Sequence, residues 1–382
     1  MKQGWEIKKL GEVFDLQMGK TPSRDNGDYW GGDNVWVAIS DLQDKYIGES
    51  KEHITDKALT ETKIKKVKAG TTIMSFKLSV GRAAITTQDL YTNEAIMAFN
   101  LNEGYDLIAD YIYYYLKGYK WQGANKAVMG LTLNKASISQ NHIAIPPREE
   151  QERIVAELDC LSGVIEKKRE QLRELDALAQ SIFYTMFGDP ITNEKGWEVK
   201  KLGEVCDIYR GGSPRPIEQY LGGNIPWIKI GDAVFGTDIY LTKTKEHIIE
   251  EGLKKTRFIH SGSLIFANCG VSLGFARIIT FDGCIHDGWL AFDNISNAIN
   301  KIFLLKSLNF CTQYFRETAP DGTQPNLNTG IMKAFAQIIP PLALQQEFAD
   351  KIEAIEKQKA LIKQSITQTE TLFNARMAYY FN

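Results

Sequence analysis

A nucleotide-binding loop is the first chemistry that the sequence suggests, because Gly19-Lys20-Thr21 has the residue types that end such loops. In a phosphate-binding loop the lysine reaches the phosphates and the hydroxyl binds Mg²⁺, but another glycine must stand five residues before the last one. Phe14 occupies that position here. A second copy of the segment has Gly212 where the lysine should be. We therefore expect no nucleotide site at this loop.

Other catalytic motifs are also incomplete. Glu6-Ile7-Lys8 and Glu198-Val199-Lys200 have the Glu-x-Lys spacing of some nucleases, but neither has a suitable upstream aspartate. Pro146-Pro147 lies between Ile145 and Arg148, so it is not part of the Pro-Pro-aromatic motif of amino-methyltransferases. None of the histidines shows the spacing of metal ligands: His53, His142, His247, His260 and His286. The sequence therefore predicts neither a catalytic centre nor a metal site.

An internal repeat indicates which elements must position any functional side chain. Residues 4–13 read GWEIKKLGEV, and residues 196–205 read GWEVKKLGEV. Further matches follow in the same order: Gly19-Lys20-Thr21-Pro22 with Gly211-Gly212-Ser213-Pro214, Tyr29-Trp30-Gly31-Gly32 with Tyr220-Leu221-Gly222-Gly223, Lys51-Glu52-His53-Ile54 with Lys245-Glu246-His247-Ile248, Ser79-Val80-Gly81 with Ser272-Leu273-Gly274, Leu133-Asn134 with Leu327-Asn328, and Ile145-Pro146-Pro147 with Ile339-Pro340-Pro341. So long a period indicates a duplicated domain rather than a solenoid.

Each half begins with a mixed α/β region. Residues 1–147 and 188–341 hold short β-rich runs, such as residues 35–39 and 263–266, separated by Gly, Asn, Asp and Pro. A Pro-Pro pair ends each region, because the residue before a proline avoids the helical conformation. We therefore predict two similar globular domains of the α/β (α+β) class with these boundaries.

The second part of each half predicts a long helix. Residues 148–187 contain no proline, and only Gly163 interrupts a run rich in Glu, Arg, Lys, Leu and Ala. Positions alternately four and three apart are mostly apolar there and in residues 342–382, which is the heptad pattern of helices that need a partner helix. The residues expected to pair the helices are Ile154, Leu158, Leu161, Ile165, Leu172, Leu175, Ile352, Ile355, Ile362 and Ile366.

Two such helices in one duplicated chain favour an antiparallel coiled coil with a pseudo-two-fold axis, in which the helices separate the two globular domains. At ~1.5 Å per residue, each helix would be roughly 60 Å long. The alternative is that each helix packs on its own globular domain.

Composition limits the class of protein. The chain has 382 residues, 43% of them hydrophobic, so more than one domain is expected. Its five cysteines are scattered without a Cys-x-x-Cys pair, and its N-terminus lacks the apolar stretch of a signal peptide, which predicts a cytoplasmic protein. No apolar run is long enough to span a membrane, so no membrane partner is expected. The net charge of −2 gives no overall indication of a polyanionic partner.

The ordered double set of motifs resembles the specificity subunit of a type I restriction-modification enzyme. The resemblance rests on the opening phrases, the Gly-Lys-Thr-Pro and Gly-Gly-Ser-Pro segments, the tryptophan strands at Trp36 and Trp227, the Leu-Asn pairs and the helix exit at residues 183–190. No single motif is specific, but the set covers the whole chain in order. The resemblance implies two target recognition domains, each reading one half of an asymmetric, gapped DNA site, and helices that set the spacing.

The resemblance also implies partners and cofactors. Two methyltransferase subunits would dock on the paired helices, double-stranded DNA would be the ligand, and binding of two restriction subunits stays open. The chain itself would be non-catalytic and without a cofactor, because S-adenosylmethionine, ATP and Mg²⁺ would bind to partner subunits. The assembled complex would be an adenine-specific DNA methyltransferase and an ATP-dependent endonuclease. The alternatives are the specificity chain of a related fused restriction-methylation system, a self-contained methyltransferase or nuclease, and a protein-interaction scaffold.

Candidate DNA-reading residues follow from the divergence of the two halves. Arg or Lys suits guanine and Asn or Gln suits adenine, and the residues that differ should lie in loops beside the shared landmarks. Three pairs of loops fit: Lys20, Ser23 and Arg24 with Arg210, Ser213 and Arg215; Lys77, Ser79 and Arg82 with Asn268 and Ser272; and Asn125, Lys126 and Thr132 with Thr323, Gln324 and Asn326. The alternative for each residue is turn chemistry or a surface charge.

Residues common to both halves carry a different expectation. A shared residue cannot explain a difference in sequence reading, so core packing is favoured over base stacking for Trp5, Trp36, Trp197 and Trp227. Two basic runs could contact phosphates, with solvated surface as the alternative for both: Lys63, Lys65, Lys66 and Lys68, and Lys254, Lys255 and Arg257.

Overall fold

The repeated opening phrase folds in the same way in both halves of the computed structural model. It forms a strand followed by a single-turn helix, and these elements are β1 (Glu6–Lys9) with α1 (Leu10–Val13), and β14 (Glu198–Lys201) with α6 (Leu202–Val205). The leucine and valine of each short helix are buried, which anchors the phrase in the core of its own domain. The structure describes residues 4–122, 125–127, 130–233, 239–319 and 326–381.

The chain divides into two compact units. The first comprises Met1–Lys167 and Ile366–Asn382, and the second comprises Lys168–Ser365. Each unit therefore contains one globular domain and a segment of both long helices.

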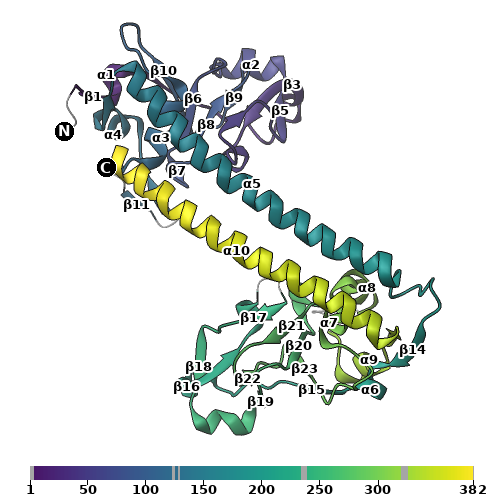
Figure 1. Ribbon diagram of the computed structural model, residues 1–382. Coiled ribbons are helices and arrows are strands. Elements are labelled where there is room, and N and C mark those ends of the chain that lie inside the picture. Colours follow the sequence, from purple (N-terminus) through teal and green to yellow (C-terminus); the bar gives the residue numbers. More distant parts are fainter. Residues whose placement is uncertain (1–3, 123–124, 128–129, 234–238, 320–325, 382) are drawn as a thin grey trace. The chain divides into compact units, whose positions relative to one another are not determined.

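Short strands and helices build the globular domain of the first unit (Figure 1). After β1 and α1 they are β2 (Phe14–Met18), η1 (Gly27–Tyr29), β3 (Trp30–Val37), η2 (Ile39–Asp41), β4 (Tyr46–Ile47), β5 (Glu52–Ile54), α2 (Asp56–Thr62), β6 (Thr72–Ser75), β7 (Lys77–Leu78), β8 (Ala83–Thr86), β9 (Tyr91–Thr92), β10 (Ile96–Leu101), α3 (Ala109–Gly118), β11 (Asn125–Ala127), β12 (Gly130–Thr132), α4 (Lys135–Gln140) and β13 (His142–Ile145). The sheets have the orders β2-β10-β6-β8-β4, β5-β3-β9, β11-β12-β7 and β1-β13. Helix α3 packs on β6 and β8.

The globular domain of the second unit repeats this plan. After β14 and α6 its elements are β15 (Asp207–Arg210), η3 (Ile217–Gln219), β16 (Leu221–Ile228), η4 (Ile230–Asp232), β17 (Tyr240–Leu241), β18 (Glu246–Ile248), η5 (Glu250–Lys255), β19 (Arg257–Ile259), β20 (Leu264–Ala267), η6 (Gly270–Ser272), β21 (Ala276–Ile279), β22 (Gly283–Ile285), β23 (Trp289–Asp293), α7 (Lys301–Phe310), α8 (Thr312–Thr318), α9 (Thr329–Ala334) and β24 (Ala336–Ile339). Its sheets have the orders β15-β23-β20-β21-β17, β18-β16-β22-β19 and β14-β24. The five-stranded sheets thus match strand for strand, which confirms the duplication and the mixed α/β class.

A long helix follows each globular domain: α5 (Arg148–Phe187) and α10 (Leu342–Phe381). A buried glutamine fixes the start of each helix to its own domain. In the first unit, Gln151 accepts a hydrogen bond from the backbone N–H of Ile108 at 3.0 Å and donates to the carbonyl oxygen of Asp106 at 2.8 Å. In the second unit, Gln345 accepts a hydrogen bond from the backbone N–H of Asn300 at 2.9 Å and donates to the carbonyl oxygen of Ala298 at 3.0 Å.

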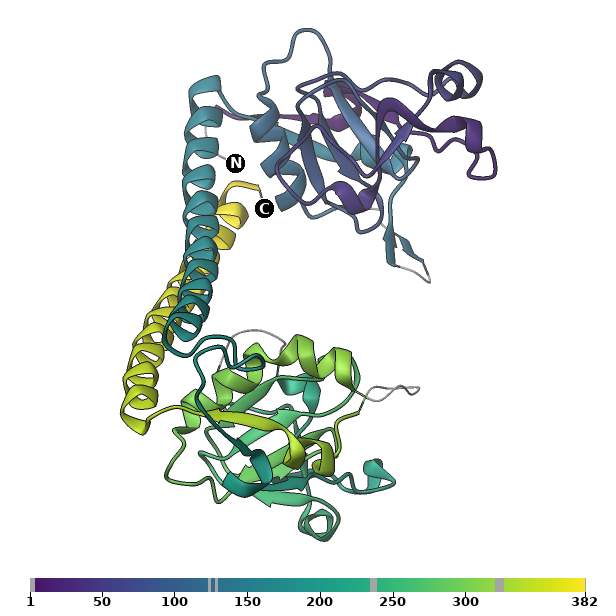
Figure 2. The ribbon, with the colours of Figure 1, turned by 90° about the vertical axis from the view of Figure 1, so that its right-hand side faces the viewer.

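The two helices pair in antiparallel directions within each unit, and they lie side by side in Figure 1 and Figure 2. In the first unit, Arg376 of α10 donates to Oε2 of Glu157 of α5 at 2.8 Å. In the second unit, Lys168 of α5 donates to the hydroxyl of Ser365, and Lys359 of α10 lies 2.8 Å from Asp176 of α5. Higher numbers in α5 therefore pair with lower numbers in α10.

The residues expected to pair the helices are removed from solvent, but they do not all contact only the partner helix. Six are buried (Ile154, Leu158, Ile165, Ile352, Ile355 and Ile366) and four are half-buried (Leu161, Leu172, Leu175 and Ile362). Ile154 and Leu158 also belong to the hydrophobic core of the first domain, and Ile352 and Ile355 to that of the second. Each helix therefore packs on its own domain as well as on the other helix, so the alternative expectation also holds in part.

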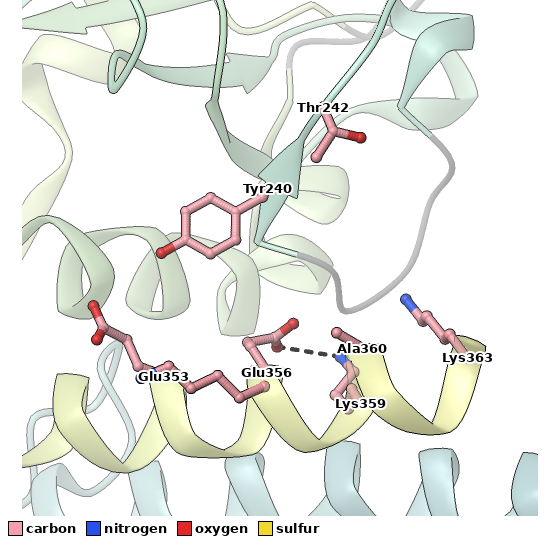
Figure 3. A pocket seen from close by; sticks show the side chains of 8 residues that line it. Tyr240, Thr242, Glu353, Glu356, Lys359, Ala360 and Lys363 are labelled. Carbon is pink, nitrogen blue, oxygen red and sulfur yellow. Dashed lines mark hydrogen bonds and ion pairs between the residues drawn. The ribbon is translucent and has the colours of Figure 1, made fainter. Parts of the chain in front are cut away.

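Ion pairs reinforce the junction between each domain and the helices. In the first unit, Nζ of Lys45 lies 2.6 Å from Asp110 of α3 and 2.5 Å from Asp159 of α5. In the second unit, Glu356 of α10 lies 3.6 Å from Nζ of Lys306 of α7. The same carboxylate lies 3.2 Å from Nζ of Lys359 (Figure 3). This second cluster borders a cavity between β17 and α10, which is lined by Tyr240, Thr242, Glu353, Glu356, Lys357, Lys359, Ala360 and Lys363.

Among the described helices, none combines the length and the apolar composition needed to cross a membrane. Within the same described ranges, no group of three or more His, Cys, Asp or Glu side chains is arranged to hold a metal ion. All five cysteines are free.

Candidate nucleic-acid interface

The first candidate loop has the same backbone frame in both domains. In the first domain, the backbone N–H of Gly19 donates to the carbonyl oxygen of Ile96 at 3.1 Å, and the N–H of Lys20 donates to the carbonyl oxygen of Thr92 at 2.8 Å. In the second domain, Gly211 donates to Trp289 and Gly212 to Ile285, both at 2.9 Å. The repeated hydroxyl adds a matching side-chain bond, because Thr21 donates to Glu94 and Ser213 donates to Asp287 at 2.8 Å. The shared landmark thus holds the loop, while its remaining side chains can differ.

Gly19 is required by close backbone approach, which gives a testable consequence. A Cβ atom at this position would lie 2.3 Å from the carbonyl oxygens of Thr92 and Asn93. We expect Gly19→Ala to lower the free energy of unfolding by about 1–3 kcal/mol, because the backbone must shift to relieve the overlap. Urea unfolding monitors the change. Gly27→Ala is the control, since nothing lies within 4 Å of its Cβ position, and equal stability of the two variants would contradict this account.

Arg24 of the first domain is engaged within its own domain. Its guanidinium pairs with both carboxylate oxygens of Glu52, the second contact being 2.9 Å, and lies 3.9 Å from the ring centre of Trp30 and 5.0 Å from that of Trp36. The hydrogen bond from Arg24 lowers the pKa of Glu52 below its usual value. Lys20 donates to the carbonyl oxygen of Thr62 at 2.7 Å. Ser23, Arg24 and Lys20 are nevertheless exposed, so the cluster lies at the surface.

The corresponding place in the second domain is arranged differently. Arg210 donates to the carbonyl oxygen of Asp287 at 2.9 Å, and Arg215 is exposed at the edge of a cavity. Lys229 pairs with Glu246, the counterpart of Glu52 in the repeat. His286 lies beside this group, and its pKa is lowered by burial and by the charges of Lys229, Arg215 and Arg210, although Asp287 opposes the shift. This shift favours the neutral imidazole.

The second and third candidate loops of the first domain meet in one small sheet. Strand β12 pairs with both β7 and β11, so Thr132 lies opposite Lys77 and also opposite Asn125, while Lys126 lies opposite Leu131. Lys77 and Ser79 are half-buried, and Arg82 is exposed.

In the second domain the corresponding loops also meet. Cys269 and Asn326 form an isolated β-bridge, and the side-chain amide of Asn268 donates to Oδ1 of Asn326 at 3.1 Å. Asn268 is fully buried, so its side chain is not presented to solvent here. Ser272 is half-buried in η6, whereas Thr323 and Gln324 lie outside the described residues.

In each domain the first and second loops adjoin the start of the same strand. Gly19 and Phe76 donate to the carbonyl oxygens of Ile96 and Ala95, and Gly211 and Asn268 donate to those of Trp289 and Gly288. The pKa of Glu94 lies below its usual value. Burial opposes this shift, but the hydrogen bond from Thr21 and the nearby charges of Lys77 and Arg24 lower the pKa. In the second domain, burial raises the pKa of Cys269, with Asp287 adding to the shift and Arg210 opposing it. The structure thus brings together loops that the sequence treats as separate.

The basic runs are partly used for local contacts. Lys66 lies 3.4 Å from Asp89, Lys255 donates to the hydroxyl of Tyr220 at 2.6 Å, and Arg257 stacks 4.4 Å from the ring centre of Tyr209. Arg257 also donates to the carbonyl oxygen of Arg210 at 3.3 Å, which joins this run to the first loop. Trp36 and Trp227 are buried, and Trp5 and Trp197 are half-buried against the two domain cores, which confirms core packing.

Comparison with known proteins decides the family. The family model described as the type I restriction modification DNA specificity domain matches this chain twice, over residues 2–176 and 194–371. The chain belongs to this specificity-domain family. The resemblance found in the sequence is therefore confirmed, and each match covers one globular domain and most of the helix that follows it.

Two type I specificity subunits are similar to this specificity-domain chain, one over most of the chain and the other over less than half of it. The type I restriction enzyme MjaIX specificity subunit of Methanocaldococcus jannaschii is 27% identical over 378 residues, which cover 92% of this chain and 86% of that protein. The HindI specificity subunit of Haemophilus influenzae is 25% identical over 45% of this chain and 40% of its own.

Two solved structures share the fold of this specificity-domain chain. A chain from a study of complex assembly and conformational transition of the type I R-M system superposes with a TM-score of 0.64 at 18% identity, covering 100% of this chain and 98% of its own. The type I restriction-modification S subunit from M. genitalium superposes with a TM-score of 0.56 at 14% identity. The match covers 99% of this chain and 96% of that one.

Sequence reasoning missed three charged residues of this candidate interface: Glu52, Lys229 and Glu246. The two glutamates belong to a repeated landmark, which suggested a framework role. One difference between the halves could have indicated this place. Two residues after the repeated tryptophan, the first domain has Ala38 and the second has Lys229.

Proposed function

We propose that this chain is the DNA-recognition subunit of a type I restriction-modification complex. Each globular domain reads one half of an asymmetric, gapped site in double-stranded DNA, and the helices dock two methyltransferase subunits. The chain contributes no catalytic group. S-adenosylmethionine, ATP and Mg²⁺ act in the partner subunits, which methylate adenine and, where restriction subunits join, cleave DNA.

The observation that carries this proposal is the repeated loop frame. Both domains hold the first loop by the same backbone bonds and the same hydroxyl-to-carboxylate bond, yet the exposed side chains differ. Lys20, Ser23 and Arg24 are exposed in one domain, and Arg210 and Arg215 are exposed in the other. A constant frame with different donors suits two unlike half-sites, because base edges are distinguished by the donors and acceptors that face them.

Methylome sequencing tests the proposal. A host that expresses this chain with its methyltransferase partner should gain adenine methylation on both strands of one gapped, asymmetric motif, whereas the methyltransferase alone should give none. A soluble complex that produces no new motif would count against DNA recognition and favour a protein-interaction scaffold.

Docking of a methyltransferase subunit is supported by an exposed apolar groove on the helix segments of the second unit. The groove is lined by Gln171, Glu174, Leu175, Leu178, Gln358, Leu361 and Ile362. Leu361 is 67% exposed and Leu178 is 48% exposed, which is unusual for neighbouring leucines on a free surface.

Leu361→Asp is expected to weaken binding of the methyltransferase subunit by about tenfold or more, because a charge would be buried in an apolar contact. Isothermal titration calorimetry with the purified partner measures the effect. Leu342→Asp is the control, since Leu342 is an exposed leucine of the same helix that does not line the groove. Unchanged affinity of the Leu361 variant would remove this groove from the docking surface.

A further inference from the structure

The two domains differ most clearly at the glutamate that they share. In the first domain, Glu52 pairs with the guanidinium of Arg24, which stacks on the indole of Trp30, and the Glu52 side chain stays 41% exposed. In the second domain, the counterpart of Arg24 is Pro216 and the counterpart of Trp30 is Leu221. Residues at this place in the second domain line a cavity of about 650 Å³.

The cavity combines apolar walls with one ion pair. It is lined by Ser213, Pro214, Arg215, Pro216, Ile217, Glu218, Leu221, Trp227, Lys229, Glu246 and His286. The side chains of Lys229 and Glu246 stay 37% and 33% exposed although they pair. An ammonium has three N–H donors and a carboxylate has two acceptor oxygens, so each group keeps hydrogen-bonding capacity for a ligand.

The neighbourhood favours a ligand with both donors and acceptors over a free anion. Arg215 at the rim and nearby Arg210 supply positive charge that suits a DNA backbone. Glu246 inside the cavity would repel an anion that entered it. The indole N–H of Trp227 finds no acceptor among the described residues, whereas the indole of Trp36 donates to the carbonyl oxygen of Lys20 at 3.0 Å. The second domain thus leaves this indole N–H without the acceptor that its counterpart has in the first domain.

In the major groove, a G·C pair displays the guanine O6 and N7 acceptors beside the cytosine N4 amino donor. Lysine pairs with the guanine acceptors, and glutamate accepts from the cytosine amino group. An adjacent Lys–Glu couple therefore matches one G·C edge, with lysine toward guanine and glutamate toward cytosine. A carboxylate alone would be repelled by the phosphates, and Lys229 offsets that charge.

We propose that Lys229 and Glu246, at the surface of this cavity, read the edge of one G·C base pair in the half-site of the second domain. The first domain has no equivalent couple, because Ala38 stands in place of Lys229 and Arg24 pairs with Glu52 there. This inference rests on the proposed function. It adds a specificity-determining site whose occupant is the edge of a single base pair.

Binding of the chain, assembled with its methyltransferase partner, to duplexes with single base-pair changes tests the inference. The wild-type complex should lose about tenfold to a hundredfold in affinity when one G·C pair of one half-site becomes A·T. Glu246→Gln and Lys229→Met should reduce that discrimination at the same position and leave the other half-site unchanged. Leu221→Trp, which places the bulkier residue of the first domain at this cavity, should weaken binding through the same half-site.

The controls separate misfolding and failure of the proposed function from failure of the inference. Val199 is exposed on β14 and does not line the cavity, so Val199→Ile should retain wild-type binding, and thermal unfolding of each variant reports its fold. Wild-type discrimination by folded Glu246→Gln and Lys229→Met complexes would overturn the inference, as would a second half-site without a G·C pair. A wild-type complex that ignores DNA sequence would instead overturn the proposed function itself.

Discussion

Replacing Glu356 by alanine is expected to destabilise the second unit by about 3–5 kcal/mol. The carboxylate lies between two buried ammonium groups, Lys306, which is 4% exposed, and Lys359, which is 2% exposed. These lysines come from different elements, α7 and α10, and Lys359 also pairs with Asp176 of α5. Removing Glu356 therefore leaves excess positive charge in a site with little water to solvate it.

The pH dependence of this loss follows from Lys306. Burial lowers the pKa of Lys306 below that of an unfolded lysine, although the charge of Glu356 opposes the shift. Without Glu356, the pKa of Lys306 in the folded protein falls further. At pH values between the folded and the unfolded pKa of Lys306, the unfolded chain then binds more protons than the folded protein. Stability of the variant then rises with pH, and the loss relative to wild type should be smaller near about pH 9 than near about pH 7.

Urea unfolding of the two proteins at both pH values measures these effects. Glu353→Ala is the matched control, because Glu353 is exposed on α10 about one turn before Glu356 and should change stability by no more than about 0.5 kcal/mol. Similar losses for the two alanine variants would show that the buried charge cluster contributes little.

Phe187→Ala is expected to cost about 3–5 kcal/mol, because it opens a cavity where α5, α7 and α10 meet. Phe187 is fully buried, with its ring centre 4.8 Å from that of Phe303 and 5.3 Å from that of Phe348. Phe183, one turn earlier, contacts the same two rings, so the gap cannot collapse without moving this neighbour.

Calorimetric unfolding measures this loss, and the second unit should respond because Phe187, Phe303 and Phe348 all belong to it. Leu178→Ala provides the comparison on the same helix, since Leu178 is 48% exposed and its truncation should cost far less. Equal melting temperatures for the two variants would contradict the packing that the structure describes.

Much of the fold was accessible from the sequence because it depends on local or repeated patterns. The repeated phrase GWE(I/V)KKLGEV marks the start of both globular domains, and it forms a strand and a helical turn in each. The heptad pattern predicted two long helices, and all ten expected pairing residues are buried or half-buried. Periodicity indicates which face of a helix avoids water but not what covers that face. It therefore could not decide between pairing of the helices and packing on the domain cores, and the structure shows that Ile154 and Ile352 also belong to those cores.

Polar residues within the helices show the same limit. Lys168 and Lys359 interrupt the apolar seam, yet one donates to Ser365 and the other pairs with Asp176. Gln151 and Gln345 look like surface residues of a polar helix start, yet both are buried and bond to backbone groups of their own domains. The chemistry of these residues depends on partners far away in the chain, which no local pattern specifies.

The candidate interface separates the two kinds of information most clearly. The sequence by itself determined the family, the duplication, the framework role of the tryptophans and the three loops in which the halves diverge. Only the tertiary structure decided that these loops meet, that Asn268 is buried, that Arg24 pairs with Glu52, and that Lys229 and Glu246 border a cavity. The physical reason is that a side chain's role depends on the distance to groups on other strands and loops, and folding alone sets those distances.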